Sequence, residues 1–108
     1  QDLAPTWEAL AELMVDAGEK LGKRNADDYS ENDFEAAEKV EVPVMIGKVD
    51  CVAHPTVCNT QQTIRAYPTL RLFVDGERWK GGDYKGHRTL LEMVEWLFHV
   101  EEEHKGHM

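Results

Sequence analysis

The segment VPVMIGKVD, at residues 42–50, limits the possible folds more than any other stretch of the chain. Its hydrophobic residues occupy both alternating faces, a pattern typical of a strand that is buried on both sides. A strand of about residues 43–50 therefore needs other elements packed on both of its faces. The pattern predicts an α/β domain in which helices cover a sheet.

An amphipathic helix is predicted before this strand, from about residue 3 to 22. Its hydrophobic residues recur every three or four positions and so share one face of the helix. They are Leu3, Trp7, Leu10, Met14, Ala17 and Leu21. Pro5 fits the first turn of a helix that begins here, but it would bend a helix that began earlier.

The chain after the strand predicts a helix, a hairpin and a final helix. Pro55 suits the first turn of a helix that runs to about Ile64. Asp75 and Gly76 are the preferred pair for a two-residue hairpin turn. Thr89 and Glu92 form a capping box that opens a helix through about Val100. The hydrophobic face of that helix comprises Leu90, Val94, Leu97 and Phe98.

The charge of the chain argues against nucleic acid as a partner. The 108 residues carry 12 basic and 21 acidic side chains, for a net charge of −9, and such a balance repels phosphate backbones. Six of the acids, from Asp27 to Glu38, lie in an insert of about residues 22–41, which we interpret as a solvated loop with a short helix around FEAAEKV. No hydrophobic run approaches the roughly 20 residues that a membrane span requires.

Cys51 and Cys58 are the only cysteines. On one continuous helix their Cα atoms would lie about 10.5 Å apart, which is too far for a disulfide. If the helix begins at Pro55, the preceding turn can fold Cys51 back over Cys58, and a disulfide becomes feasible. The residues alone leave two alternatives, a disulfide or two buried thiols.

Residues 48–97 resemble the second half of a thioredoxin-like domain of the protein disulfide isomerase family. The resemblance depends on VDC with a second cysteine seven residues on, on YPTL before a strand and hairpin, and on Y-x-G-x-R before the last helix. LAPTWEAL also resembles the stretch that follows the redox motif of that family. The implied fold is thioredoxin-like α/β, with three layers, a mixed sheet, a C-terminal β-hairpin and flanking helices. The domain would cover residues 1–103, with 104–108 as a flexible tail.

The redox motif of that family, Cys-x-x-Cys, does not occur in the 108 residues. By resemblance, Leu3-Ala4-Pro5 would put its second cysteine immediately before Gln1, so we expect an N-terminally incomplete fold with the motif just upstream. The resemblance implies an oxidoreductase or isomerase that assists disulfide formation or exchange in secretory proteins. The alternative is a non-catalytic thioredoxin-like module that binds extended peptides or a partner domain.

The resemblance also implies roles for particular residues. Cys51 and Cys58 correspond to a structural disulfide outside the active site. Tyr67 and Pro68 correspond to the cis-proline loop, where the backbone of the residue before proline aligns an extended substrate. Arg88 corresponds to an arginine that lowers the pKa of the second active-site cysteine, as a nearby cation stabilises a thiolate.

Neither a metal nor a cofactor is expected. His99, His104 and His107 lie near several glutamates, but solvated charge explains them better than a metal site. The only serine, Ser30, lies in the acidic insert, so a Ser-His-Asp hydrolase has no support. The expected partners are extended or unfolded polypeptides or a partner domain, without nucleic acid or membrane contact. The resemblance implies a location in the endoplasmic reticulum lumen or elsewhere in the secretory pathway.

Overall fold

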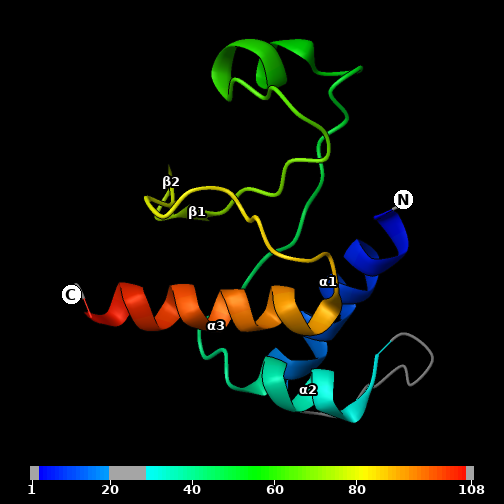
Figure 1. The fold of residues 1–108 in the computed structure, drawn as a ribbon, viewed down its shortest axis with the longest axis vertical. Helices are drawn as coiled ribbons and strands as arrows, with labels where there is room; N and C mark the ends of the chain where they lie inside the picture. Colours follow the sequence, from blue (N-terminus) through cyan, green and yellow to red (C-terminus); the bar gives the residue numbers. More distant parts are fainter. Residues whose placement is uncertain (1–2, 20–28, 107–108) are drawn as a thin grey trace. The chain divides into compact units, whose positions relative to one another are not determined.

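The computed structural model describes residues 3–19 and 29–106, which belong to two compact units. The helical unit comprises the described parts of 1–46 and 86–108, and the disulfide unit comprises 47–85. Figure 1 shows the elements in the described ranges. They are α1 (Ala4–Glu19), α2 (Glu31–Glu38), η1 (Val57–Gln61), β1 (Phe73–Val74), β2 (Glu77–Arg78) and α3 (Leu90–Gly106).

The three α-helices pack against one another in the helical unit (Figure 1). The predicted hydrophobic face of α1 is confirmed at Leu10, Met14 and Ala17, which are all buried, whereas Leu21 lies outside the described residues. Pro5 lies in the first turn, where its missing N–H costs the helix nothing. On α3, Val94 and Leu97 are buried as predicted. The core is completed by Ala9, Leu13, Tyr29, Phe34, Ala37, Met93 and Val100.

Helix α2 forms within the predicted acidic insert and begins earlier than the FEAAEKV segment suggested. Ser30 starts it with a capping box: the Ser30 hydroxyl accepts a hydrogen bond from the Asp33 N–H at 3.2 Å. The Asp33 carboxylate in turn accepts one from the Ser30 N–H at 3.0 Å. These bonds satisfy two N–H groups that the first helical turn would otherwise leave without partners.

Helix α3 runs to Gly106, so the predicted end near Val100 is wrong and residues 104–106 are helical rather than part of a flexible tail. The physical reason is a set of contacts with the chain after α2. The buried carboxylate of Glu101 accepts hydrogen bonds from the backbone N–H groups of Glu41 and Val42, at 3.0 and 2.7 Å. The Lys105 ammonium lies 2.9 Å from the Glu41 carboxylate, and a cation in the last turn also complements the helix dipole.

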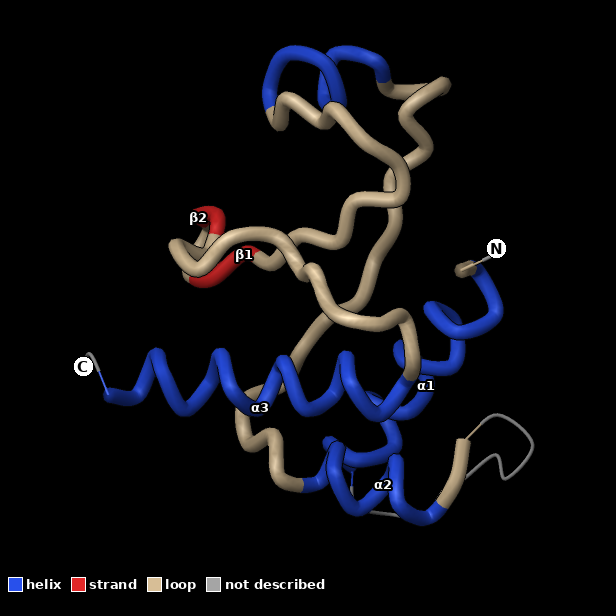
Figure 2. The backbone as a smooth tube through the Cα atoms, in the orientation of Figure 1, coloured by secondary structure: helices blue, strands red, loops and turns tan. Residues whose placement is uncertain are grey.

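The predicted hairpin is confirmed in the disulfide unit. β1 and β2 are antiparallel, with Phe73 opposite Arg78 and Val74 opposite Glu77. Asp75 and Gly76 have φ angles of 53° and 82°, and two successive positive φ angles are typical of the type I′ turn that matches the twist of paired strands. Figure 2 shows loop over most of the rest of this unit.

The predicted buried strand at about residues 43–50 is wrong. No strand forms there, and Met45 is 96% exposed. A buried strand requires neighbouring strands as well as hydrophobic side chains, because its N–H and C=O groups must pair. In the described residues the two strands pair only with each other. The helices and the antiparallel hairpin agree with the expected α/β class, but the sheet seen here is confined to the hairpin.

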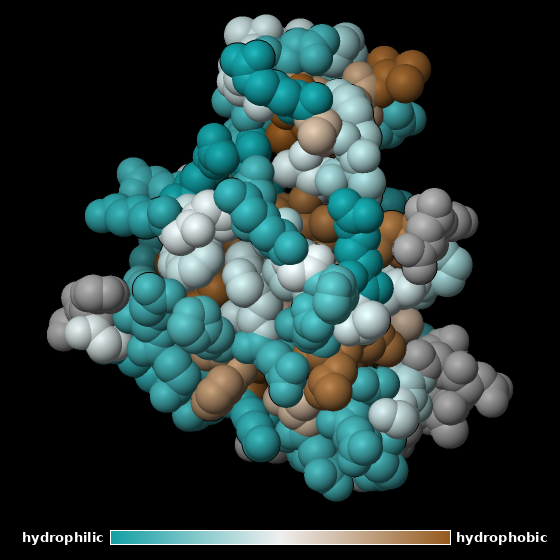
Figure 3. All heavy atoms as spheres, in the orientation of Figure 1, coloured by the Kyte–Doolittle hydropathy of each residue, from teal (hydrophilic) through white to brown (hydrophobic). Residues whose placement is uncertain are grey.

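The described helices do not include one long and hydrophobic enough to cross a membrane. In Figure 3 the visible face is mainly hydrophilic, and hydrophobic side chains show through in small separate patches.

Candidate functional site

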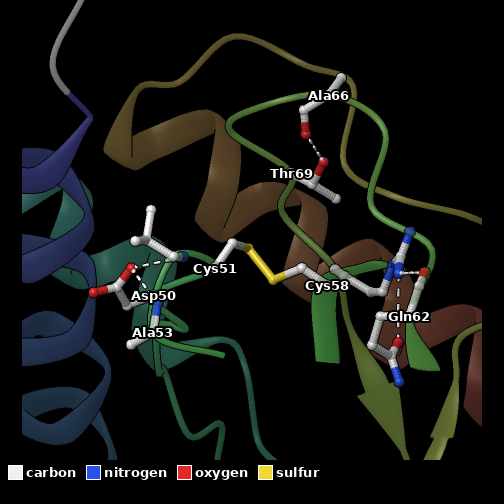
Figure 4. Close-up of a disulfide and its surroundings, with 9 residues drawn as sticks. Asp50, Cys51, Ala53, Cys58, Gln62, Ala66 and Thr69 are labelled. Atoms are coloured by element: carbon white, nitrogen blue, oxygen red, sulfur yellow. Dashed lines mark hydrogen bonds between the residues drawn. A yellow bond between two sulfur atoms is a disulfide. The ribbon is translucent and has the colours of Figure 1, made fainter. Parts of the chain in front are cut away.

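A disulfide joins Cys51 to Cys58, with the Cα atoms 5.6 Å apart (Figure 4). The short distance follows from a turn before the helix. The Asp50 carboxylate accepts hydrogen bonds from the N–H groups of Val52 and Ala53, at 3.0 and 3.3 Å. Cys51 therefore precedes the helical segment that opens at Pro55, whereas Cys58 lies buried within it.

The chain leaves this helical segment through a closely bonded turn. The Gln62 N–H donates to the Val57 carbonyl at 2.8 Å, and the Ile64 N–H donates to the Cys58 carbonyl at 2.6 Å. The second bond links Ile64 to one of the two disulfide cysteines. We call residues 63–69, which include Ile64, the Tyr67 loop.

The Tyr67 loop exposes its tip. Tyr67 is 64% exposed, Pro68 is exposed, and the peptide bond between them is cis. Within the loop, the Thr69 hydroxyl donates a hydrogen bond to the Ala66 carbonyl (Figure 4). The structure thus presents Tyr67 and Pro68 on a folded loop, accessible to another molecule.

The guanidinium of Arg71 closes the base of this loop. Its Nη1 donates to the Gln62 carbonyl at 2.6 Å, and its Nε and Nη2 donate to the two Asp83 carboxylate oxygens at 2.9 and 3.0 Å. The Arg71 side chain is only 11% exposed. Sequence reasoning missed this contact, because Arg71 lies nine positions after Gln62 and twelve before Asp83. No periodic pattern in the sequence links residues at these separations.

The Arg71–Asp83 contact changes the pKa of both groups. The hydrogen bond from Arg71 lowers the pKa of Asp83 below its ordinary value of 3.8, with smaller contributions from the charges of Arg71, Arg78 and Lys85 and with burial acting in the opposite direction. The hydrogen bond to Asp83 raises the pKa of Arg71 above its ordinary value. Both groups are therefore charged at neutral pH.

The acidic charge of the chain is not concentrated around the Tyr67 loop. Residues 47–85 contain six Lys and Arg and four Asp and Glu, for a net charge of +2, whereas the whole chain carries −9. This unit by itself therefore carries no excess of negative charge.

Four of the five residues singled out from the sequence belong to the same unit. Cys51, Cys58, Tyr67 and Pro68 all lie in the disulfide unit. Arg88 is exposed in the loop before α3, in the helical unit. Residues 3–19 and 29–106 contain no group of three or more His, Cys, Asp or Glu side chains arranged to hold a metal. His99 lies 3.4 Å from Glu103 on the same helix, and His107 is outside the described residues.

Comparison with known proteins assigns a family to this arrangement. The thioredoxin family model matches residues 1–99. The chain is 34% identical to a thioredoxin domain-containing protein 5 homolog of Drosophila melanogaster over 88% of its length. It is 40% identical to protein disulfide-isomerase A3 of Gallus gallus over 69% of its length, and 38% identical to protein disulfide-isomerase EUG1 of Saccharomyces cerevisiae over 56%.

These relatives are much longer than the matched region. The alignments cover 17%, 14% and 11% of the Drosophila, chicken and yeast proteins, respectively. No solved structure matches the chain.

Loss of the disulfide is expected to destabilise the disulfide unit. Replacing both cysteines, as Cys51→Ala and Cys58→Ala together, should lower the free energy of unfolding by about 2 to 3 kcal/mol, because a closed loop of this length restricts the unfolded chain. The change in the free energy of unfolding is measured by urea unfolding, monitored through the fluorescence of Trp79. Trp7 and Trp96 are replaced by Phe so that Trp79 alone reports. Reductant should destabilise the parent chain similarly and leave the double variant unaffected. Two alkylatable thiols in the non-reduced protein would contradict the disulfide.

The Arg71–Asp83 contact predicts a loss of stability in acid. A carboxyl group whose pKa is lowered by folding stabilises the fold above its ordinary pKa, and this contribution disappears as the pH falls through the lowered value. The same fluorescence measurement should show wild-type stability decreasing from about pH 4 downward. Asp83→Asn should be less stable than the wild type at neutral pH. Its free energy of unfolding should also fall less than that of the wild type between neutral and acid pH. Glu77→Gln, a carboxyl control on the exposed strand β2, should keep the wild-type profile. A parallel decline in wild type and Asp83→Asn would contradict the prediction.

Proposed function

This chain belongs to the thioredoxin family, and we propose that its Tyr67 loop binds extended polypeptides as part of a longer, protein disulfide isomerase-like protein. The observation that carries the proposal is the exposure of Tyr67 and Pro68 on a loop whose two ends are fixed by hydrogen bonds. A fixed loop binds with a smaller loss of conformational entropy than a mobile one. An extended peptide can pair with exposed backbone groups through strand-like hydrogen bonds.

The Tyr67 side chain adds a hydrophobic contact to such backbone pairing. A tyrosine offers a large aromatic surface with few rotatable bonds, which is why tyrosines often dominate binding energies. The net charge of +2 in residues 47–85 also imposes no barrier to acidic peptides. We therefore expect the loop to accept unfolded chains through backbone and hydrophobic contacts, with little dependence on one particular sequence.

Removal of the Tyr67 side chain tests peptide binding. The probe is fluorescein-labelled insulin B chain with its cysteines carboxymethylated, which separates binding from redox chemistry. Tyr67→Ala should raise the Kd measured by fluorescence anisotropy about tenfold, since it removes the exposed aromatic contact. Phe73→Ala, at a 48% exposed aromatic residue outside the loop, should change the Kd by less than about twofold. Equal effects of the two substitutions would contradict a specific role for Tyr67.

Catalysis would require a second cysteine pair. Cys51 and Cys58 are joined to each other, and the described residues contain no free cysteine. Thiol-disulfide exchange begins when a thiolate attacks a substrate disulfide and forms a mixed disulfide, which a second thiol then resolves. We propose that a Cys-x-x-Cys motif immediately before Gln1 supplies these thiols. A location in the endoplasmic reticulum lumen or elsewhere in the secretory pathway fits this proposal, because disulfides persist in oxidising compartments.

Reduction of insulin by the full-length parent protein tests the catalytic proposal. Activity should be lost when the upstream cysteines are replaced and retained when Cys51 and Cys58 are both replaced, measured at a temperature where the variants remain folded. Activity that survives loss of the upstream motif but not loss of Cys51 and Cys58 would assign the redox role to the latter pair. If no Cys-x-x-Cys motif precedes Gln1 in the parent protein, the catalytic proposal is wrong and the chain is a non-catalytic binding module. The peptide-binding experiment then tests its function.

A further inference from the structure

We infer that Arg71 is a positioning residue for the Tyr67 loop and that its guanidinium sets the affinity of the loop for extended peptides. The inference rests on the proposed function and identifies the contact that shapes the binding surface. Arg71 lies three residues after Pro68 and bonds to Gln62, five residues before Tyr67. A single side chain therefore bridges the two ends of the loop.

The bridge is anchored on a third segment of the chain. Asp83 receives two hydrogen bonds from Arg71, and the Tyr84 N–H donates to the Leu70 carbonyl at 2.9 Å. The end of the loop that contains Leu70 and Arg71 is thus held through both backbone and side-chain bonds. Its other end is held through the Gln62 carbonyl and, one turn earlier, through the disulfide. Between these anchors the loop can present Tyr67 in one arrangement.

The geometry requires an arginine. Three nitrogens of one planar group reach two acceptor groups in different segments, and the side chain that carries them is only 11% exposed. A lysine keeps the positive charge but has a single nitrogen on a flexible stem, so it cannot reproduce this forked arrangement. Arg71→Lys therefore changes the geometry of the bridge while it conserves the charge.

A matched pair of arginine substitutions tests the inference in the full chain. Arg78 is a suitable control, because it is about half exposed and its Nη2 lies 3.8 Å from the same Asp83 carboxylate. Arg71→Lys should raise the Kd for the carboxymethylated insulin B chain about tenfold, whereas Arg78→Lys should change it by less than about twofold. Binding is measured well below the unfolding midpoint of each variant, where a role confined to stability leaves the Kd unchanged. Amide NMR shifts should change at residues 63–69 in Arg71→Lys and remain in place in Arg78→Lys.

The possible outcomes separate this inference from the proposed function. Weak binding by both Tyr67→Ala and Arg71→Lys supports both. Weak binding by Tyr67→Ala with a wild-type Kd for Arg71→Lys overturns the positioning role alone, even if the unfolding midpoint falls. If Arg71→Lys does not fold, Asp83→Asn carries the same prediction, because it removes the charge and one of the two acceptor oxygens of the anchor but retains the arginine. No binding by the wild-type chain overturns the proposed function and the role of Arg71 with it.

Discussion

The scarcity of buried hydrophobic surface in residues 47–85 is the constraint on which the candidate site depends. The structure describes every residue of this segment. Among its hydrophobic residues, only Cys58 and Leu70 are buried. Such a segment cannot offset the conformational entropy of ordering a long loop by hydrophobic burial alone. The Cys51–Cys58 disulfide reduces that cost by restricting the unfolded chain, and the bonds of Arg71 and Asp83 fix the parts that the disulfide does not reach.

The features that the sequence predicted correctly depend on residues close together in the chain. Leu10, Met14 and Ala17 repeat with the period of a helix, and the Asp75-Gly76 pair adopts the backbone that its composition favours. The resemblance to the thioredoxin family added the pairing of Cys51 with Cys58, which spacing alone left open. The binding role of Tyr67 and Pro68 also came from that resemblance and stays a prediction, because no hydrophobic or charge pattern distinguishes them from other loop residues.

The errors and omissions concern contacts between distant residues. Hydrophobic residues at 42–50 predicted a buried strand, but burial depends on partner strands that the segment cannot specify by itself. Helix α3 passes its predicted end because Glu101 bonds to the backbone at Glu41 and Val42, about sixty residues earlier. Arg71 and Asp83 are twelve positions apart. In the last two cases the deciding group is a polar partner whose distance along the chain no periodicity encodes.

A polar bridge suits a binding loop better than a hydrophobic anchor would. The Gln62 carbonyl at the base of the loop needs a hydrogen-bond partner, and a hydrophobic side chain packed there would leave it unsatisfied. Arg71 satisfies this carbonyl and the Asp83 carboxylate together, so the base of the loop is fixed without covering its tip. Tyr67 therefore stays exposed while the backbone around it is held. Restraint at the base with exposure at the tip is the arrangement that lets a loop pair with an incoming strand at small entropic cost.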